Sequence, residues 1–266
     1  NTNYYQLLYP YVGISAYWYC YEEGYTNYTN ISQCPNYGQY DNGQDVFNLY
    51  TNFAGNSLPA GWTWTVLSNP TGSSGSIIVN NSLTIFNTNG YDFWCSDYMI
   101  TLVYYENLVL INQIFETLVT NLQGNSADTG WTKAGILYQN QVNTAASNGE
   151  IDMIVTNGAG YTIQWQTIAS EIAPCDSSGG NPISYPSVIA LIAPNNYNVG
   201  GFYGPYLDYL TQVGNYVTPT SISPQGFIGL FITSHNSNDY TSTATFQYFL
   251  ARAYPPNGVM PSIYIG

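Results

Sequence analysis

The stretch NQIFETLVTNL, residues 112–122, alternates in a way that predicts a β-strand. Successive side chains of a strand point to opposite faces of its sheet, so every second residue shares a face. The two predicted faces are Ile114, Glu116, Leu118 and Thr120 on one side, and Phe115, Thr117, Val119 and Asn121 on the other. This pattern, repeated elsewhere in the chain, decides the fold class.

Similar segments, rich in β-branched and aromatic residues, alternate with Gly, Pro, Asn and Ser clusters. The stretch GSIIVNNSLTIF predicts two strands joined at Asn80 and Asn81. The 25 Gly and 14 Pro would interrupt most helices. We therefore expect an all-β jelly-roll sandwich of two antiparallel sheets with roughly twelve or more strands. The exception is residues 204–217, where one short helix is expected, lined by Tyr206, Leu207, Tyr209, Leu210 and Val213.

Charged residues make up 6% of the 266 residues, against roughly 25% in ordinary soluble domains. Asn, Thr, Ser, Gln and 28 Tyr must solvate the surface instead, and their hydrogen bonding does not change when carboxylates titrate. The chain has 15 acidic and two basic residues, Lys133 and Arg252, and a formal charge of −13. This composition indicates an acid-tolerant surface and excludes nucleic acid and anionic membranes as partners.

The four cysteines show no CxxC spacing, and a single histidine accompanies them, which favours disulfides over a zinc site. Three pairings are open. We prefer Cys20 with Cys34 and Cys95 with Cys175, because closing the longer loop constrains the unfolded chain most. Buried free thiols are the alternative.

An extracellular or cell-surface location is expected from several weak signals that agree. Glycosylation sequons begin at Asn27, Asn30 and Asn80. The chain starts without Met or an apolar leader, as a processed product would. The most apolar region, near residues 100–122, is interrupted by Glu106, Asn112 and other polar residues, so we expect no membrane span.

Residues 1–40 differ in texture from residues 41–266, because they are dense in aromatic residues and poor in alternation. One interpretation is a strand that packs on its own sandwich. The other is a donor strand that completes the sheet of an identical subunit, since a terminal apolar segment needs a sheet edge to accept it. The predicted interface residues are Tyr4, Tyr5, Leu7, Leu8, Tyr9, Tyr11, Val12 and Ile14.

Five stretches together resemble the concanavalin A-like lectin/glucanase sandwich of secreted and surface proteins of thermophilic archaea. They are QYDNGQDVFNLYTNFAGNSLPAGW (39–62), GSIIVNNSLTIFN (75–87), WTKAGILYQN (131–140), GEIDMIVTNG (149–158) and FLARAYPPNGVMPS (249–262). The resemblance covers about residues 39–262, and its YDNG and YPPNG elements are the most specific. It implies a jelly roll whose concave face is a sugar-binding groove, and it extends to the subunits of archaeal extracellular threads.

Glycosidases of that fold carry a Glu, an Asp two residues later and a second Glu shortly after. Glu150 and Asp152 match the first two positions, but residues 154 and 155 are Ile and Val. A retaining glycosidase needs two carboxyls about 5–5.5 Å apart. We therefore interpret the pair as degenerate and expect no enzyme activity. A structural Glu150 is the ordinary explanation, and sugar or cation binding with Trp131, Tyr161 and Trp165 as stacking platforms is the alternative.

Other constellations are weaker. His235 lacks a nucleophile in a recognisable elbow, and the ADTG turn around Asp128 lacks the second copy that an aspartic protease needs. We expect no cofactor, although the DNG turn at residues 41–43 with Asp45 keeps calcium open.

Two functions remain. The first is a homopolymeric surface filament, glycosylated and assembled by strand donation, with a role in adhesion or cell contact. The alternative is a secreted lectin-like carbohydrate-binding protein with a degenerate glucanase site. An excess of Tyr and Asn favours the first, because Tyr buries much area at interfaces.

Overall fold

The computed structural model describes most of the chain between residues 47 and 254. The described ranges are 47–68, 74–88, 92–94, 97–109, 111–124, 130–140, 142, 149–157, 160–168, 178–184, 186–195, 198–205, 210–217, 225–234 and 241–254. Within these ranges all regular structure is β-strand. The boundary predicted near residue 40 lies outside them.

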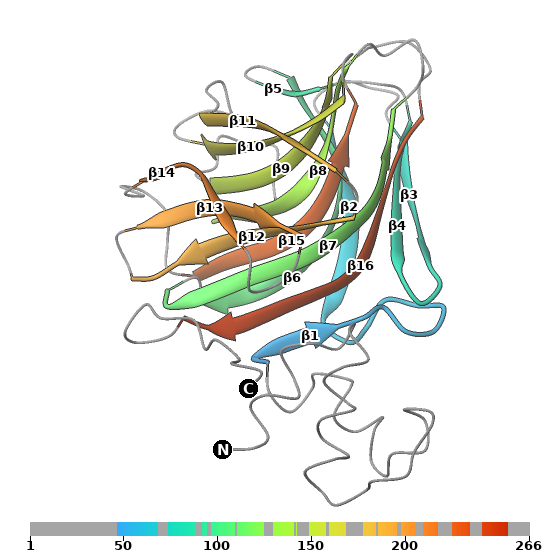
Figure 1. The fold of residues 1–266 in the computed structure, drawn as a ribbon. Helices are drawn as coiled ribbons and strands as arrows, with labels where there is room; N and C mark the ends of the chain where they lie inside the picture. The colour runs from blue at the N-terminus through green and yellow to red at the C-terminus, as the bar shows by residue number, and fades with distance from the viewer. Residues whose placement is uncertain are drawn as a thin grey trace, which may run out of the picture.

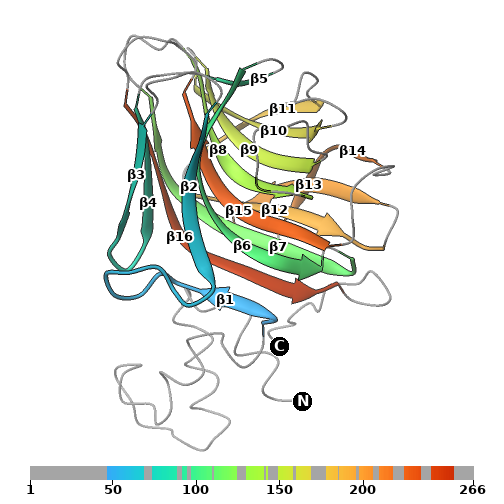
Figure 2. The ribbon, with the colours of Figure 1, turned by 180° about the vertical axis from the view of Figure 1, so that it is seen from behind.

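The strands form two antiparallel sheets that lie one against the other (Figures 1 and 2). Sheet A has the order β14 (Thr211–Val217), β13 (Val199–Gly204), β12 (Ser187–Ala193), β7 (Gln113–Gln123), β16 (Ser242–Ala253), β4 (Leu83–Thr88) and β3 (Ser74–Val79), with β1 (Leu49–Thr51) also paired to β16. Sheet B has the order β11 (Ser178–Ile183), β10 (Gly160–Ile168), β9 (Gly149–Asn157), β8 (Gly130–Gln139), β15 (Gln225–Thr233), β6 (Asp97–Val109) and β2 (Trp62–Ser68), with β5 (Phe93–Trp94) also paired to β6. The jelly-roll sandwich predicted from the sequence is confirmed.

Strand β7 shows how the alternation builds the sandwich. Phe115 and Val119 lie on the inner face of sheet A, the face that packs on sheet B, and both are fully buried in the main core. Ile114 and Glu116 lie on the outer face, and they are fully buried as well. The predicted division of β7 into two faces therefore holds for residues 114–119. The pairing with β16 shifts between Val119 and Asn121, and beyond that shift Leu122, not Asn121, is buried in the main core. Burial on the outer face explains why apolar residues occur at both sets of positions.

The core between the sheets is organised around Trp62 on β2. Its ring lies 5.8 Å from Phe53, 5.9 Å from Tyr105 and 5.1 Å from Phe249, in edge-to-face arrangements that aromatic rings prefer. Phe249 belongs to sheet A, so this cluster joins the two layers. Packing these rings between the sheets removes a large apolar area from contact with water.

The edges of the two sheets meet at β2 and β3 (Figure 2). Gly75 on β3 makes this approach possible. A Cβ at Gly75 would lie 2.1 Å from Thr101 Oγ1 and 2.9 Å from Val66 Cγ2, which is closer than real Cβ atoms come. Any larger residue would force β3 away from sheet B.

A buried ion pair crosses the outer face of sheet A. Arg252 on β16 donates to Oε1 of Glu116 on β7 over 2.8 Å, and both residues are buried. A charge in this environment is tolerated only when it is paired, because desolvation would otherwise be costly. The pairing of these two charges thus allows β7 and β16 to be buried on the outer as well as the inner face of sheet A.

The predicted hairpin at Asn80 and Asn81 is confirmed between β3 and β4. Asn81 has a φ of 51°, a left-handed conformation that Asn tolerates in tight turns. The Asn80 backbone N–H donates to the Ser82 carbonyl over 3.0 Å, and Asn80 is exposed. The sequon beginning at Asn80 therefore lies at an ordered, accessible turn.

The predicted short helix is wrong where the structure describes it. Residues 211–217 form β14, which pairs with β13, and Val213 is fully buried in the main core. The apolar spacing is compatible with either structure, and pairing to an existing sheet edge outweighs local helix preference. Gly214, with a φ of 63°, further disfavours a helix. Residues 206–209 lie outside the described ranges.

Among the described residues, no helix has the length and apolar character that crossing a membrane would require.

We predict that removing one member of the Glu116–Arg252 pair strongly destabilises the protein, whereas replacing both members with apolar residues does not. Glu116→Leu or Arg252→Met alone should lower the free energy of unfolding by about 3–5 kcal/mol, because each leaves a buried charge without its partner. The double variant should lie within about 1 kcal/mol of the parent or exceed it. Urea unfolding of all four proteins measures this cycle, and additive losses in the double variant would contradict it.

We also predict that Asn80 accepts an N-linked glycan when the chain is secreted from a host that modifies Asn-x-Ser/Thr sequons. Asn80→Gln and Ser82→Ala should each remove one glycan mass from the intact protein. Ser82→Thr preserves the sequon and should retain that mass, which makes it the matched control. An unchanged intact mass in Asn80→Gln would contradict the prediction.

Candidate functional site

The described part of the chain exposes a tryptophan at the start of β8. Trp131 is 47% exposed and has a φ of 122°. The pairing of β8 with β9 shifts between Gly130 and Lys133, so Trp131 lies in a bulge. Positive φ is a strained conformation for a bulky residue, and such strain and such bulges concentrate at functional sites, where they orient a side chain. Trp131 is therefore the first residue to consider.

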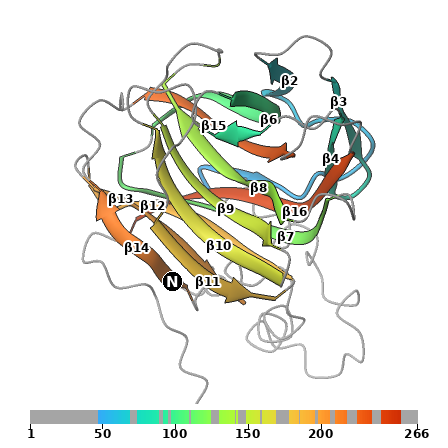
Figure 3. The same ribbon diagram turned by 90° about the horizontal axis from the view of Figure 1, so that it is seen from above.

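The strand register brings the predicted stacking residues to neighbouring strands. Gly130 on β8 pairs with Asn157 on β9, and Asn157 pairs with Gly160 on β10. Tyr161 follows Gly160, so Trp131 near the start of β8 and Tyr161 near the start of β10 lie at the same end of sheet B. Figure 3 shows strands β8, β9 and β10 side by side. Trp165 lies four residues further along β10. The structure describes the backbone of Tyr161 and Trp165 but not their side chains.

The register also locates the degenerate glycosidase motif. Glu150 pairs with Tyr138, and Asp152 pairs with Ile136. Tyr138 and Ile136 are fully buried in the main core, on the inner face of sheet B. In the backbone pairing, positions 150 and 152 therefore lie opposite two core residues of β8. The side chains of β9 are not described.

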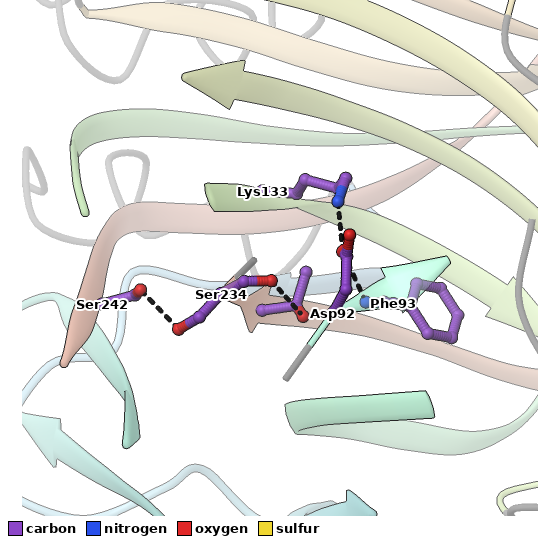
Figure 4. A network of polar contacts seen from close by, with 6 residues as sticks. Asp92, Phe93, Lys133, Ser234 and Ser242 are labelled. Atoms are coloured by element: carbon purple, nitrogen blue, oxygen red, sulfur yellow. Dashed lines mark hydrogen bonds and ion pairs between the residues drawn. The ribbon is translucent and has the colours of Figure 1, made fainter. Parts of the chain in front are cut away.

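The outer face of sheet B carries the second buried ion pair. Lys133 on β8 donates to Asp92, and Asp92 also accepts a hydrogen bond from the Phe93 N–H over 2.7 Å (Figure 4). The ring of Phe93 lies 6.0 Å from that of Phe231 on β15. These contacts fasten β5 over one end of the outer face, two residues from Trp131. They were not predicted from the sequence, although Lys133 is one of only two basic residues.

A separate polar contact lies beside this pair in Figure 4. The hydroxyls of Ser234 and Ser242 are 2.6 Å apart, and both residues are fully buried. The contact joins the end of β15 in sheet B to the start of β16 in sheet A. It satisfies two buried hydroxyls and holds the end of the sandwich together.

At the other end of sheet B, Glu106, Asn107 and Val109 of β6 are exposed. Tyr104 on β6 is half-buried and packs edge-to-face on Phe227 of β15, with ring centroids 5.6 Å apart. Burial, and to a smaller extent the negative charge of Glu106, raises the pKa of Tyr104 above its usual value. Burial likewise raises the pKa of Tyr138. The Tyr104 hydroxyl therefore stays neutral across the ordinary pH range and can donate or accept hydrogen bonds.

Two carboxylates of this face have described side chains. Asp92 is engaged by Lys133, and Glu106 is exposed at the far end of the face. A glycosidase would need two carboxyls on either side of a bond. Among the described residues, no group of three or more His, Cys, Asp or Glu side chains could hold a metal ion.

Several predicted residues lie outside the described ranges. The calcium turn at residues 41–43 with Asp45, the donor strand of residues 1–15 and the filament that depends on it stay predictions. The same holds for Cys20, Cys34, Cys95 and Cys175, for Asn27 and Asn30, for Asp128 and for His235.

No protein-family description matches the sequence, and no curated protein matches it. Solved structures do match in fold. A GH43 glycoside hydrolase engineered to display endo-xylanase and exo-arabinofuranosidase activity has a TM-score of 0.52 and 10% identity, over 78% of this chain and 41% of that one. The present chain thus spans less than half of that enzyme's length.

Two further matches cover most of their own chains. A structure reported with the endo-acting O-glycanases that human gut bacteria use to initiate mucin breakdown has a TM-score of 0.50 and 10% identity, over 78% of this chain and 99% of that one. The exoplasmic/lumenal domain of VIP36, bound to Ca²⁺ and mannose, has a TM-score of 0.48 and 8% identity, over 83% and 91%. At such identities the matches show the fold alone, a β-sandwich that is also the fold of a glycoside hydrolase.

We predict that the Glu150 and Asp152 pair does not hydrolyse glycans. The protein incubated with β-glucan or xylan should release no more reducing ends than buffer, because a second catalytic carboxylate is missing from positions 154 and 155. Glu150→Gln should behave identically. Release by the parent protein that is abolished in Glu150→Gln, as a colorimetric reducing-end assay would detect, would contradict the prediction.

Proposed function

We propose that the protein binds carbohydrate through the end of sheet B where Trp131 lies. The observation that carries the proposal is the exposure of Trp131. This residue is 47% exposed, and its backbone has a φ of 122° in the bulge of β8. An exposed indole on a fixed backbone offers a flat apolar surface that a ligand can cover. The apolar faces of sugar rings are suited to stacking on such a surface.

The bulge makes this platform effective. Trp131 lies between the Gly130–Asn157 and Lys133–Val155 pairs of β8 with β9, and β15 pairs with β8 from Lys133 onward, so the backbone that flanks Trp131 is held in sheet B before a ligand arrives. An ordered platform loses little conformational entropy on binding, and more of the contact energy then appears as affinity. Tyr161, on the same end of the sheet, supplies a second aromatic residue at a neighbouring strand position.

The proposal is binding without hydrolysis, by an extracellular protein. Support comes from the missing third acidic residue of the glycosidase motif, from the backbone pairing of positions 150 and 152 with the core residues Tyr138 and Ile136, and from a fold shared with proteins reported to act on xylan and mucin glycans. The low charge content and neutral polar composition suit hydrogen bonds to sugar hydroxyls.

The test compares two exposed tryptophans. Trp131→Ala should weaken retention on an array of neutral oligosaccharides by roughly tenfold or more, which corresponds to loss of one stacked ring. Trp64→Ala is the matched control, because Trp64 is 42% exposed but lies on β2, with β15 and β6 between β2 and β8. This control should bind like the parent.

Thermal unfolding of both variants separates lost binding from lost folding. Equal retention by Trp131→Ala and the parent would refute Trp131 as the platform. If the parent protein is retained on no oligosaccharide of the array, carbohydrate binding itself is refuted.

A further inference from the structure

Both basic side chains of the protein are withdrawn from its surface. The chain contains two Lys and Arg residues in total, Lys133 and Arg252. Lys133 is 2% exposed and Arg252 is 8% exposed. They lie on the outer faces of different sheets, Lys133 on sheet B and Arg252 on sheet A.

Each of these cations is committed to a carboxylate of its own. Lys133 is paired with Asp92, and Arg252 is paired with Glu116 over 2.8 Å. Turning either cation toward a ligand would leave a buried carboxylate without its counter-ion, which a folded protein strongly resists. Neither side chain is therefore available to a molecule that binds at the surface.

The remaining charge is of one sign. Of the 15 acidic residues, Asp92 and Glu116 are neutralised by these pairs, and the other carboxylates give the chain its formal charge of −13. Sulfate, phosphate and uronate groups are bound chiefly by Arg and Lys, through charge-assisted hydrogen bonds. At neutral pH an anionic ligand would find no such partner here and would be repelled by the field of the protein.

We propose that the ligand of the Trp131 site is a neutral glycan, and that the sequestered cations make the site discriminate against anionic glycans. This inference rests on the proposed function and specifies its substrate class. Recognition then depends on stacking against Trp131 and on hydrogen bonds between neutral groups. It is nearly independent of ionic strength, because no ion pair with the ligand is formed or screened.

Matched glycans test the discrimination directly. The parent protein is applied at pH 7 to immobilised xylohexaose, laminarihexaose, mannohexaose and galactohexaose, each in unmodified and sulfated form. We expect retention on at least one neutral oligosaccharide and at least roughly tenfold weaker retention on its sulfated counterpart at low salt. Between about 0.05 M and about 0.5 M NaCl, retention on the neutral form should change by less than about twofold.

The outcomes separate this inference from the function on which it rests. Retention of the sulfated forms in preference to the neutral ones, lost at high salt, would overturn the neutral-glycan inference while carbohydrate binding stands. Retention of no oligosaccharide in either form would overturn carbohydrate binding, and the inference with it. Trp131→Ala should lose retention of the neutral form, whereas Trp64→Ala should keep the same preference as the parent.

Discussion

The structure depends on burying both faces of its central strands. Phe115 and Val119 of β7 face the core between the sheets, while Ile114 and Glu116 on the same strand are buried on the other side. A chain that covers both faces of a sheet must pair the charges that it buries there with opposite charges. Arg252 meets Glu116 on sheet A, and Lys133 meets Asp92 on sheet B, for this reason.

The fold was predictable because strand periodicity is a local property. Residues 112–122 show which side chains share a face before any partner strand is known, and the Asn80 and Asn81 turn is specified by the left-handed preference of Asn. A helix was predicted for residues 211–217, which form a strand instead. Val213 is buried by β13 and by the opposing sheet, and the local sequence does not indicate either contact. Propensity loses to tertiary pairing at such an edge.

The site was predictable only in part. Trp131 was a candidate from composition, but its bulge and positive φ depend on how β8 meets β9. The Lys133–Asp92 pair joins residues 41 positions apart, so spacing along the chain could not indicate it. Glu150 and Asp152 matched a motif, yet the register opposite Tyr138 and Ile136 is a property of the assembled sheet. The residue types indicated sugar binding, but only the assembled sheet shows that Trp131 is exposed.

The two ion pairs also bear on resistance to proteolysis. Trypsin-like proteases cleave after Lys or Arg, and the only such bonds, after Lys133 and Arg252, lie within paired strands with buried side chains. Cleavage there would require β8 or β16 to separate from its neighbours, which is close to unfolding the sandwich. Trypsin-like proteases should therefore cleave the folded protein slowly, because both of their cleavage sites lie in paired strands and both side chains are held in buried ion pairs.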